Sequence, residues 1–174
     1  NSIAVQSDGK IVIAGTASNN FAVARFTTSG ALDAAGFGSP NGYVTTAFTA
    51  SVEGKAVAIQ ADGKIVVAGH ILNSKFVLAR YNTDGTLDTT FGTAGKVETS
   101  STVGGVTLTR INALVIQSDG KIVAVGYTQI GSLFLIVARY NVDGYLNLSF
   151  ANGVGYLTKQ ILSSTGERGP SNAL

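Results

Sequence analysis

Apolar runs broken by short polar turns divide the chain into segments that fit β-strands. Within residues 57–69 one apolar run ends at Gln60-Ala61-Asp62-Gly63-Lys64, and a second run, Ile-Val-Val-Ala, follows at once. Asp-Gly between two such runs is a strong signal of a β-hairpin, because it tolerates the positive φ of a type I′ turn. The pattern therefore predicts two antiparallel strands joined at residues 61–64.

The same hairpin pattern occurs three times. Residues 3–15 and 114–126 match residues 57–69 almost position by position, at a period of about 55 residues. Each hairpin is followed by an arginine before an aromatic residue, then by a turn ending in Leu-Asp or Leu-Asn, and then by a phenylalanine. The marks of the three copies are Asp8-Gly9, Asp62-Gly63 and Asp119-Gly120; Arg25, Arg80 and Arg139; Asp33, Asp88 and Asn147; and Phe37, Phe91 and Phe150.

Further apolar runs complete a unit of four strands. Residues 76–82 predict a third strand and residues 95–99 a fourth. A four-stranded antiparallel meander of this length is the size of one β-propeller blade. Residues 65–68 are apolar at successive positions, which predicts burial on both faces, as between stacked blades. The predicted fold class is therefore all-β, with three propeller blades. A parallel β-solenoid is the alternative, although its coils need no tight Asp-Gly hairpin.

The repeat pattern also predicts the domain organisation. Residues 1–54, 55–111 and 112–171 form three repeats, and residues 172–174 begin a further one. The chain thus starts and stops at the same phase, which indicates a fragment from within a longer array. Because closed propellers have about four to eight blades, three blades leave two apolar faces uncovered. We expect further repeats of the same chain, or a homo-oligomer, to cover them.

The unit resembles the delta-60 repeat, a bacterial family with the pattern Gln-x-Asp-Gly-Lys-Ile-Val-x-x-Gly and then Ala-Arg-Tyr-Asn-x-Asp-Gly-x-Leu-Asp-x-x-Phe-Gly. The middle copy, residues 60–95, fits best. The first copy has Thr27-Thr28-Ser29 in place of Asn-x-Asp, and the third has Asn147 and Ala151 in place of Asp and Gly. The resemblance covers essentially the whole chain. It implies a propeller-like architecture in large, mostly secreted or surface proteins, and it says more about architecture and location than about chemistry.

An arginine inside an apolar strand needs a partner, because an unpaired buried guanidinium is costly. The repeat supplies one at the following Leu-Asp or Leu-Asn turn. A group present in every unit belongs more often to the scaffold than to a binding site, so a structural clamp is favoured over a ligand contact. The expected pairs are Arg25 with Asp33, Arg80 with Asp88, and Arg139 with Asn147.

Two sets of residues invite comparison with metal sites. Asn82, Asp84 and Asp88 have a weak likeness to a calcium loop, with oxygen side chains at intervals around a glycine. The first copy does not show this pattern, and no glutamate follows at the spacing that bidentate calcium binding requires. A plain turn is therefore favoured. The single His70 has no second histidine or cysteine with which to bind zinc, and we expect it in a surface loop.

Segments that differ between the copies share one end of the predicted blades. In an up-and-down meander, the loop between the second and third strands lies at the same end as the linker between units. These segments vary in length and sequence, whereas the hairpin turns are nearly constant. Variable loops on a rigid scaffold commonly carry binding, so we expect a binding face there. Its candidate residues are Asn19, Asn20, Asn73, Lys75, Gln129, Glu53, Glu98, Arg110, Glu167 and Arg168.

Composition narrows the remaining classes of function. With 13% charged residues and a formal net charge of +2, the chain has no extended basic surface, and we expect no nucleic-acid partner. The absence of cysteine excludes a disulfide framework and is compatible with export. No apolar run approaches the ~20 residues of a membrane helix, so membrane insertion is not expected.

Catalysis is not expected either. Of the acidic residues only Glu53, Glu98 and Glu167 stand outside the repeat pattern, and no cofactor motif is present. The predicted function is a non-enzymatic extracellular or cell-surface scaffold that binds protein or glycan through its variable loops, as in adhesion. The alternatives are a structural protein that self-assembles through its blade faces, and part of an enzyme whose active site lies on other blades.

Overall fold

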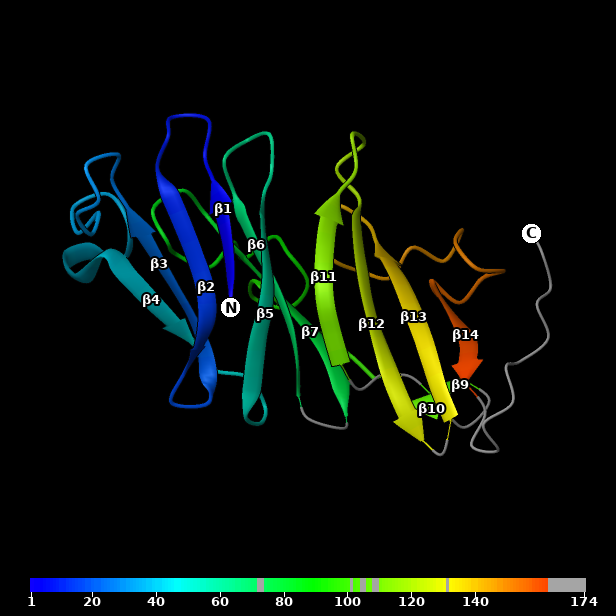
Figure 1. The fold of residues 1–174 in the computed structure, drawn as a ribbon. Coiled ribbons are helices and arrows are strands. Elements are labelled where there is room, and N and C mark those ends of the chain that lie inside the picture. The colour runs from blue at the N-terminus through cyan, green and yellow to red at the C-terminus, as the bar shows by residue number, and fades with distance from the viewer. Residues whose placement is uncertain (72–73, 101, 104–105, 108–109, 131, 163–174) are drawn as a thin grey trace.

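Three four-stranded antiparallel sheets stand side by side in chain order in the computed structural model (Figure 1). It describes residues 1–71, 74–100, 102–103, 106–107, 110–130 and 132–162. Each sheet, here called a blade, contains four strands that pair in sequence order. Blade 1 contains β1 (Ser2–Val5), β2 (Ile11–Ala17), β3 (Asn20–Phe26) and β4 (Tyr43–Thr46); blade 2 contains β5 (Val52–Ile59), β6 (Ile65–Ile71), β7 (Lys75–Tyr81) and β8 (Lys96–Thr99); blade 3 contains β11 (Arg110–Ile116), β12 (Ile122–Ile130), β13 (Ser132–Tyr140) and β14 (Tyr156–Leu162).

Little regular structure lies outside the blades in the part of the chain that the structure describes. A short hairpin of β9 (Thr102–Val103) and β10 (Val106–Thr107) precedes blade 3, and one helical turn, η1 (Gly38–Gly42), precedes β4. The predicted all-β fold class, with three four-stranded antiparallel repeats, is confirmed. β5 begins at Val52 and β11 at Arg110, slightly before the repeat starts placed at residues 55 and 112 from the sequence.

The hairpin turns differ in detail from the expected type I′ geometry. Gly63 has a φ of +82°, whereas Asp62 is not among the described residues with positive φ. The Gly63 amide donates to the Gln60 carbonyl at 2.9 Å, and the Gln60 amide donates to the Lys64 carbonyl at 2.8 Å. This is a three-residue loop with only its last residue left-handed, so the type I′ prediction is wrong. The glycine is still required, because an L side chain is strained at that φ.

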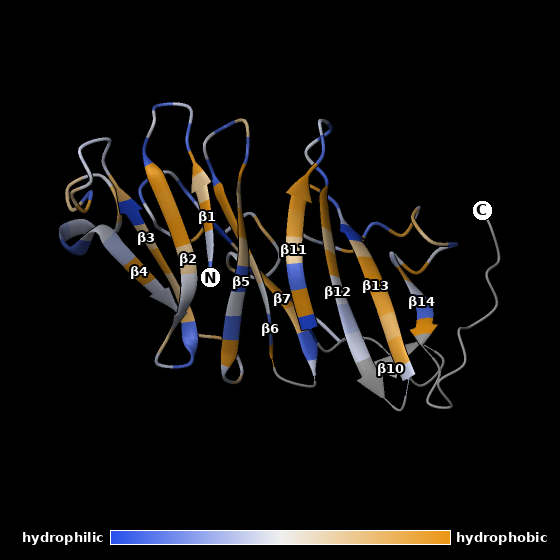
Figure 2. Cartoon of the chain, viewed as in Figure 1, coloured by the Kyte–Doolittle hydropathy of each residue, from blue (hydrophilic) through white to orange (hydrophobic). Residues whose placement is uncertain are grey.

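The core lies between blades. One apolar cluster joins blade 1 to blade 2 and includes Val12 and Phe21 against Val67 and Tyr81. The other joins blade 2 to blade 3 in the same way. Figure 2 shows the apolar residues concentrated on the strands and polar residues on the turns that join them. Blade 2, the interior blade, therefore buries both faces of its sheet.

Neighbouring blades decide how deeply equivalent strands are buried. In blade 2, Ile65, Val66, Val67 and Ala68 have no exposed surface, which confirms the predicted burial on both faces. In blade 1 the equivalent strand alternates, and Ile13 is 38% exposed. The two strands have almost the same sequence. The difference arises because blade 1 has a neighbour on one face only.

Candidate functional site

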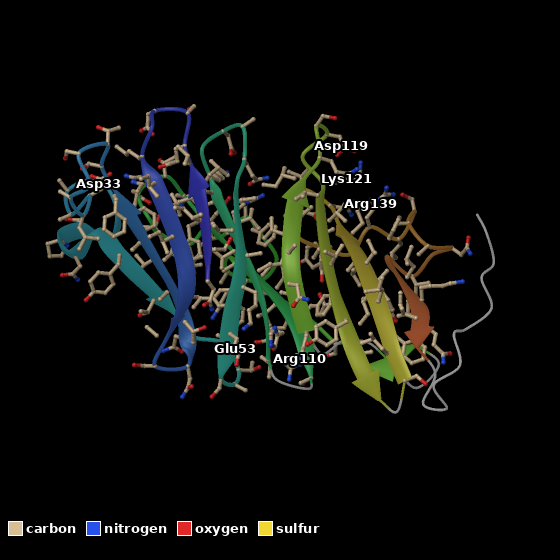
Figure 3. All side chains as sticks on the ribbon, viewed as in Figure 1. Asp33, Glu53, Arg110, Asp119, Lys121 and Arg139 are labelled. Atoms are coloured by element: carbon tan, nitrogen blue, oxygen red, sulfur yellow. The ribbon has the colours of Figure 1, made fainter. Side chains whose placement is uncertain are left out.

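The blades have two chemically different ends. The hairpin turns at residues 7–10, 61–64 and 118–121, together with the segments that join the third and fourth strands, lie at what we call the turn end. The start of β5 and the end of β6 lie at the opposite end, since Glu53 pairs with His70 in the register. We call this the linker end. Figure 3 shows Asp33, Asp119, Lys121 and Arg139 toward the turn end, and Glu53 and Arg110 toward the linker end.

At the turn end, each repeated arginine lies beside the acidic or amide residue expected from the sequence. Arg25 Nε donates to Asp33 Oδ2 at 2.8 Å, and both residues are buried. Arg80 Nε donates to Asp88 Oδ2 at 2.7 Å. In blade 3, Arg139 Nη2 donates to Asn147 Oδ1 at 2.9 Å, and its Nε does so at 3.3 Å. The arginines also stack on the repeated phenylalanines, with Arg80 Cζ 4.6 Å from the centre of the Phe91 ring.

Asp88 is the most strongly stabilised of these carboxylates. Burial alone would raise its pKa, but hydrogen bonds from Thr90 and Lys64 and the charge of Arg80 hold the pKa well below its usual value. Lys64 Nζ lies 3.0 Å from Asp88 Oδ2. Asp88 is therefore ionised in the folded protein over the whole ordinary pH range.

The same arginines also reach into the next blade, which the sequence did not predict. Arg25 Nη1 donates to the Thr83 carbonyl of blade 2 at 2.5 Å, and Arg80 Nη1 donates to the Val142 carbonyl of blade 3 at 2.6 Å. A guanidinium has five N–H donors, and one carboxylate cannot accept them all. That surplus of donors was the signal that a second acceptor was needed. The clamps of Arg25 and Arg80 thus fix both their own turn and the adjacent blade.

The residues of the weak calcium likeness are engaged with other groups. Asn82 Nδ2 donates to Thr86 Oγ1, and Asp84 Oδ1 accepts from the Thr86 amide and hydroxyl. Asp88 is occupied by Arg80, as described above. Among the residues that the structure describes, no three histidine, cysteine, aspartate or glutamate side chains form a group suited to a metal ion.

A larger hollow at the turn end belongs to the constant part of the repeat. It has a volume of about 1210 Å³ and is lined mainly by the three hairpin turns. In each turn the aspartate accepts from the lysine amide two residues later, as Asp62 Oδ1 does from Lys64 at 3.1 Å. These contacts repeat from blade to blade, so they shape the hairpins and are unsuited to distinguishing one ligand from another.

The linker end contains a smaller cavity, lined mainly by blades 2 and 3 together with Asn1 of blade 1, in which the charged residues are not repeated. Its volume is about 430 Å³. Lys55 and Asn112 are the residues left unpaired at register shifts in β5 and β11. Such bulges redirect a side chain and are common beside functional sites. The lining residues are Asn1, Lys55, His70, Arg110, Asn112 and Tyr127.

His70 is buried, so its predicted place in a surface loop is wrong. It lies on β6, only 1% exposed, because blade 3 packs over this end of the strand. The Ile111 amide donates to His70 Nδ1 at 3.4 Å, which leaves the proton on Nε2 in the neutral ring. His70 Nε2 lies 3.6 Å from Glu53 Oε2. Burial lowers the pKa of His70 below its ordinary value, although Glu53 opposes this.

Charges around this cavity are only partly compensated. Lys55 Nζ forms an ion pair of 2.7 Å with Glu53 Oε2, and this contact lowers the pKa of Glu53. Arg110 lies over the Tyr127 ring, with its Cζ 6.0 Å from the ring centre. No carboxylate of the described residues forms an ion pair with Arg110. The cavity therefore has an excess of positive charge at Arg110.

Two other binding-face candidates, Lys75 and Glu98, form an ion pair within blade 2. Lys75 Nζ donates to Glu98 Oε2 at 2.8 Å. Glu98 also accepts from the Thr49 amide at 3.0 Å and the Thr49 hydroxyl at 2.8 Å, which ties blade 2 to the linker after blade 1. These two residues lie at the linker end and also hold it together.

The remaining candidates are only partly described. Asn19 and Asn20 lie at the β2–β3 turn, where the Asn19 carbonyl accepts from the Val52 amide at 2.9 Å. Gln129 is placed in β12 by its pairing with Leu133. Asn73, Glu167 and Arg168 lie outside the described residues. The described part of the linker end thus places Arg110 at one cavity, beside the Lys55 that pairs with Glu53, and joins Lys75 and Glu98 in a separate pair.

Comparison with protein families agrees with this architecture. The family described as domain of unknown function (DUF5122) beta-propeller matches residues 6–35, 60–91 and 117–150, more than half of the chain. The chain belongs to the DUF5122 beta-propeller family. Each matched range runs from a hairpin turn to the turn after the third strand of one blade. The match supports a propeller-like repeat family, while the delta-60 assignment stays a resemblance.

No curated protein matches the chain significantly. In the described residues, no helix has the length and apolar character needed to span a membrane. The DUF5122 beta-propeller match identifies the chain as a repeat scaffold, and it says nothing of a ligand.

Proposed function

We propose that this DUF5122 chain is a non-enzymatic scaffold that binds a protein or glycan partner through its linker end. The supporting observation is the different use of the two ends. At the turn end, the repeated arginines are already engaged in hydrogen bonds within and between blades. At the linker end, the charged residues Lys55 and Arg110, which differ from their equivalents in the other blades, line a cavity with an excess cation. Variable side chains on a rigid repeat scaffold are suited to recognising one partner.

The cavity favours an acidic group on that partner. Arg110 offers a planar guanidinium that can donate two parallel hydrogen bonds to a carboxylate. Asn112 adds an amide, and the neutral His70 carries a proton on Nε2. A cavity of about 430 Å³ has the size of a small-ligand site and can hold one acidic sugar or one acidic side chain.

A binding experiment with matched probes tests the proposal. Calorimetric titration would compare a glucuronic-acid oligosaccharide, a neutral glucose oligosaccharide of equal length, and an acidic peptide. We expect an acidic probe to bind, Arg110→Gln to weaken its binding at least tenfold, and Lys159→Gln, on the exposed outer strand β14, to leave the affinity unchanged. If neither acidic probe binds, or if both variants weaken binding equally, the proposed site is wrong.

We also propose that the scaffold works outside the cell or at its surface. The resemblance to secreted repeat proteins supports this location, and the cysteine-free composition is compatible with it. Protease treatment of intact cells, followed by detection of the chain, tests it. Loss of the chain from intact cells supports the proposal, and protection until lysis contradicts it.

A further inference from the structure

Each junction between blades contains the same interlock, formed by a phenylalanine of one blade and a glycine of the next. Phe37 of blade 1 lies against Gly85 of blade 2, where an added Cβ would lie 3.1 Å from the ring. Phe91 of blade 2 lies against Gly144 of blade 3, where an added Cβ would lie 2.8 Å from the ring. Both phenylalanines have no exposed surface. The glycine therefore acts as a socket that a side chain would obstruct.

Backbone hydrogen bonds accompany the interlock at both junctions. The Gly38 amide donates to the Asp84 carbonyl at 2.8 Å, and the Gly92 amide donates to the Asp143 carbonyl at 2.7 Å. The arginine clamps cross at the same place, from Arg25 to blade 2 and from Arg80 to blade 3. One junction thus consists of a donating side, with arginine and phenylalanine, and an accepting side, with glycine and carbonyl groups.

The first and last blades each leave one half of this interlock without a partner in the described chain. Gly30 of blade 1 is the equivalent of Gly85, and nothing lies within 4 Å of a Cβ added there. At the other end, Phe150 is only half-buried, and Arg139 bonds only within blade 3 among the described residues. Within the described residues, the open socket therefore lies at one edge and the unused donating side at the other.

The apolar faces at the two edges match each other in the same way as the two faces that meet at a junction between blades. The uncovered face of blade 1 contains Ile3 and Ile13, which are equivalent to Val57 and Val67, residues of blade 2 that pack on blade 1. The uncovered face of blade 3 contains equivalents of the residues with which blade 2 packs on blade 3. Its exposed members include Val115 (58%), Val125 (38%) and Leu135 (47%).

We propose that two copies of this chain dock head to tail, with blade 3 of each copy on blade 1 of the other, to form a closed six-bladed ring. In each contact Arg139 would donate to Thr28 of the partner subunit, and Phe150 would cover Gly30 of the partner subunit. Two copies use every free edge, and six blades fall within the range of about four to eight that closes a propeller. The proposal goes beyond the binding function and does not depend on it.

The oligomeric state of the intact chain tests the proposal. Sedimentation velocity over about a hundredfold range of concentration should show a species of twice the chain mass of 17.8 kDa. Ile13→Glu on blade 1 and Leu135→Glu on blade 3 should each shift the chain to monomer, because each places a charge in the contact. Both positions are partly exposed within one copy, so circular dichroism should show unchanged folding. Val154→Glu, at an exposed turn position outside the contact, is the matched control.

Mixing the two variants distinguishes a head-to-tail contact from any symmetrical one. The Ile13→Glu copy keeps an intact blade 3, and the Leu135→Glu copy keeps an intact blade 1, so one good junction forms only in the mixture. We expect the mixture to associate at concentrations where neither variant does so alone. A native chain that stays monomeric throughout, as expected if other repeats cover these faces, overturns the proposal. Dimers that survive either substitution also overturn it.

Discussion

The Tyr81 hydroxyl of blade 2 donates to Thr46 Oγ1 of blade 1 at 2.7 Å, across the buried junction between the two blades. The equivalent Tyr140 hydroxyl of blade 3 donates to Thr99 Oγ1 of blade 2 at 3.0 Å. Blade 1 has Phe26 at the corresponding position, which has no hydroxyl to donate. The aromatic position of the repeat therefore joins each blade to the one before it, as the arginine joins each blade to the one after it.

Replacing Tyr81 with phenylalanine should destabilise the fold. The substitution leaves the Thr46 hydroxyl without its buried partner, which costs about 1–2 kcal/mol. Urea denaturation would measure the loss, with the half-exposed Tyr43→Phe as a control that should leave stability unchanged.

Burial raises the pKa of Tyr81 to about 12, so the neutral form is favoured in the folded state. Stability from this group should be complete below pH about 10 and fall as the pH rises toward 12. Phenolate absorbance that shows all six tyrosines titrating together would contradict this.

The arginine clamps should differ in their contribution to stability. Arg80→Met removes the buried guanidinium beside Asp88 and leaves Lys64 and Thr90 as partners of the carboxylate. Breaking a buried pair costs about 3–5 kcal/mol, and we expect a loss toward the lower end of that range because Lys64 still compensates the charge. Arg139→Met should cost clearly less, because its partner Asn147 is neutral and no further blade accepts its remaining donors in the described chain. Chemical denaturation of the two variants side by side measures the difference. Equal losses would show that the charge on Asp88 and the bond to the next blade contribute little.

A matched pair of glycines tests the interlock within one chain. Gly85 and Gly30 have φ values of +88° and +85°, so alanine is strained equally at both. At Gly85 the added Cβ would also lie 2.9 Å from the Gly38 amide nitrogen, whereas at Gly30 it meets open space. Gly85→Ala should therefore destabilise the fold by about 1–3 kcal/mol more than Gly30→Ala, as measured by thermal unfolding of the monomer. A difference near zero would mean that the junction shifts easily to accept the methyl group.

The sequence predicted what is local and missed what depends on a neighbouring blade. The Asp62-Gly63 hairpin and the apolar strand after it follow from turn chemistry and periodicity, and both are present. The Arg80–Asp88 contact followed from the cost of a buried charge. The burial of His70 could not be seen in this way, because the residues that cover it come from blade 3.

The interlock was missed for the same reason. Gly85 belongs to an ordinary Asn-x-Asp-Gly turn, and nothing in that turn shows that the Phe37 ring of another blade lies against it. The cavity at the linker end depends on register shifts at Lys55 and Asn112, which the apolar pattern does not reveal. A pattern that identifies strands thus says little about which side chains meet between sheets.

His70 provides a pH-dependent readout of the linker end. Burial lowers its pKa, so the unfolded chain binds a proton more readily than the folded chain does. Stability from the neutral ring is therefore present above the unfolded pKa of about 6.5 and is lost as the pH falls through the lower folded value. The charged groups that affect it are Glu53, which favours protonation, and Lys55 and Arg110, which oppose it.

The chain has one histidine, so its imidazole NMR signals can be followed without ambiguity. We expect His70 to titrate below its ordinary pKa in the native protein, and Arg110→Gln to move that pKa upward, because a nearby positive charge is removed. His70→Asn, which keeps an acceptor for the Ile111 amide, should flatten the loss of stability between about pH 6.5 and 5. An unshifted titration in the native protein would mean that water reaches the ring, and that this end of blades 2 and 3 is open in solution.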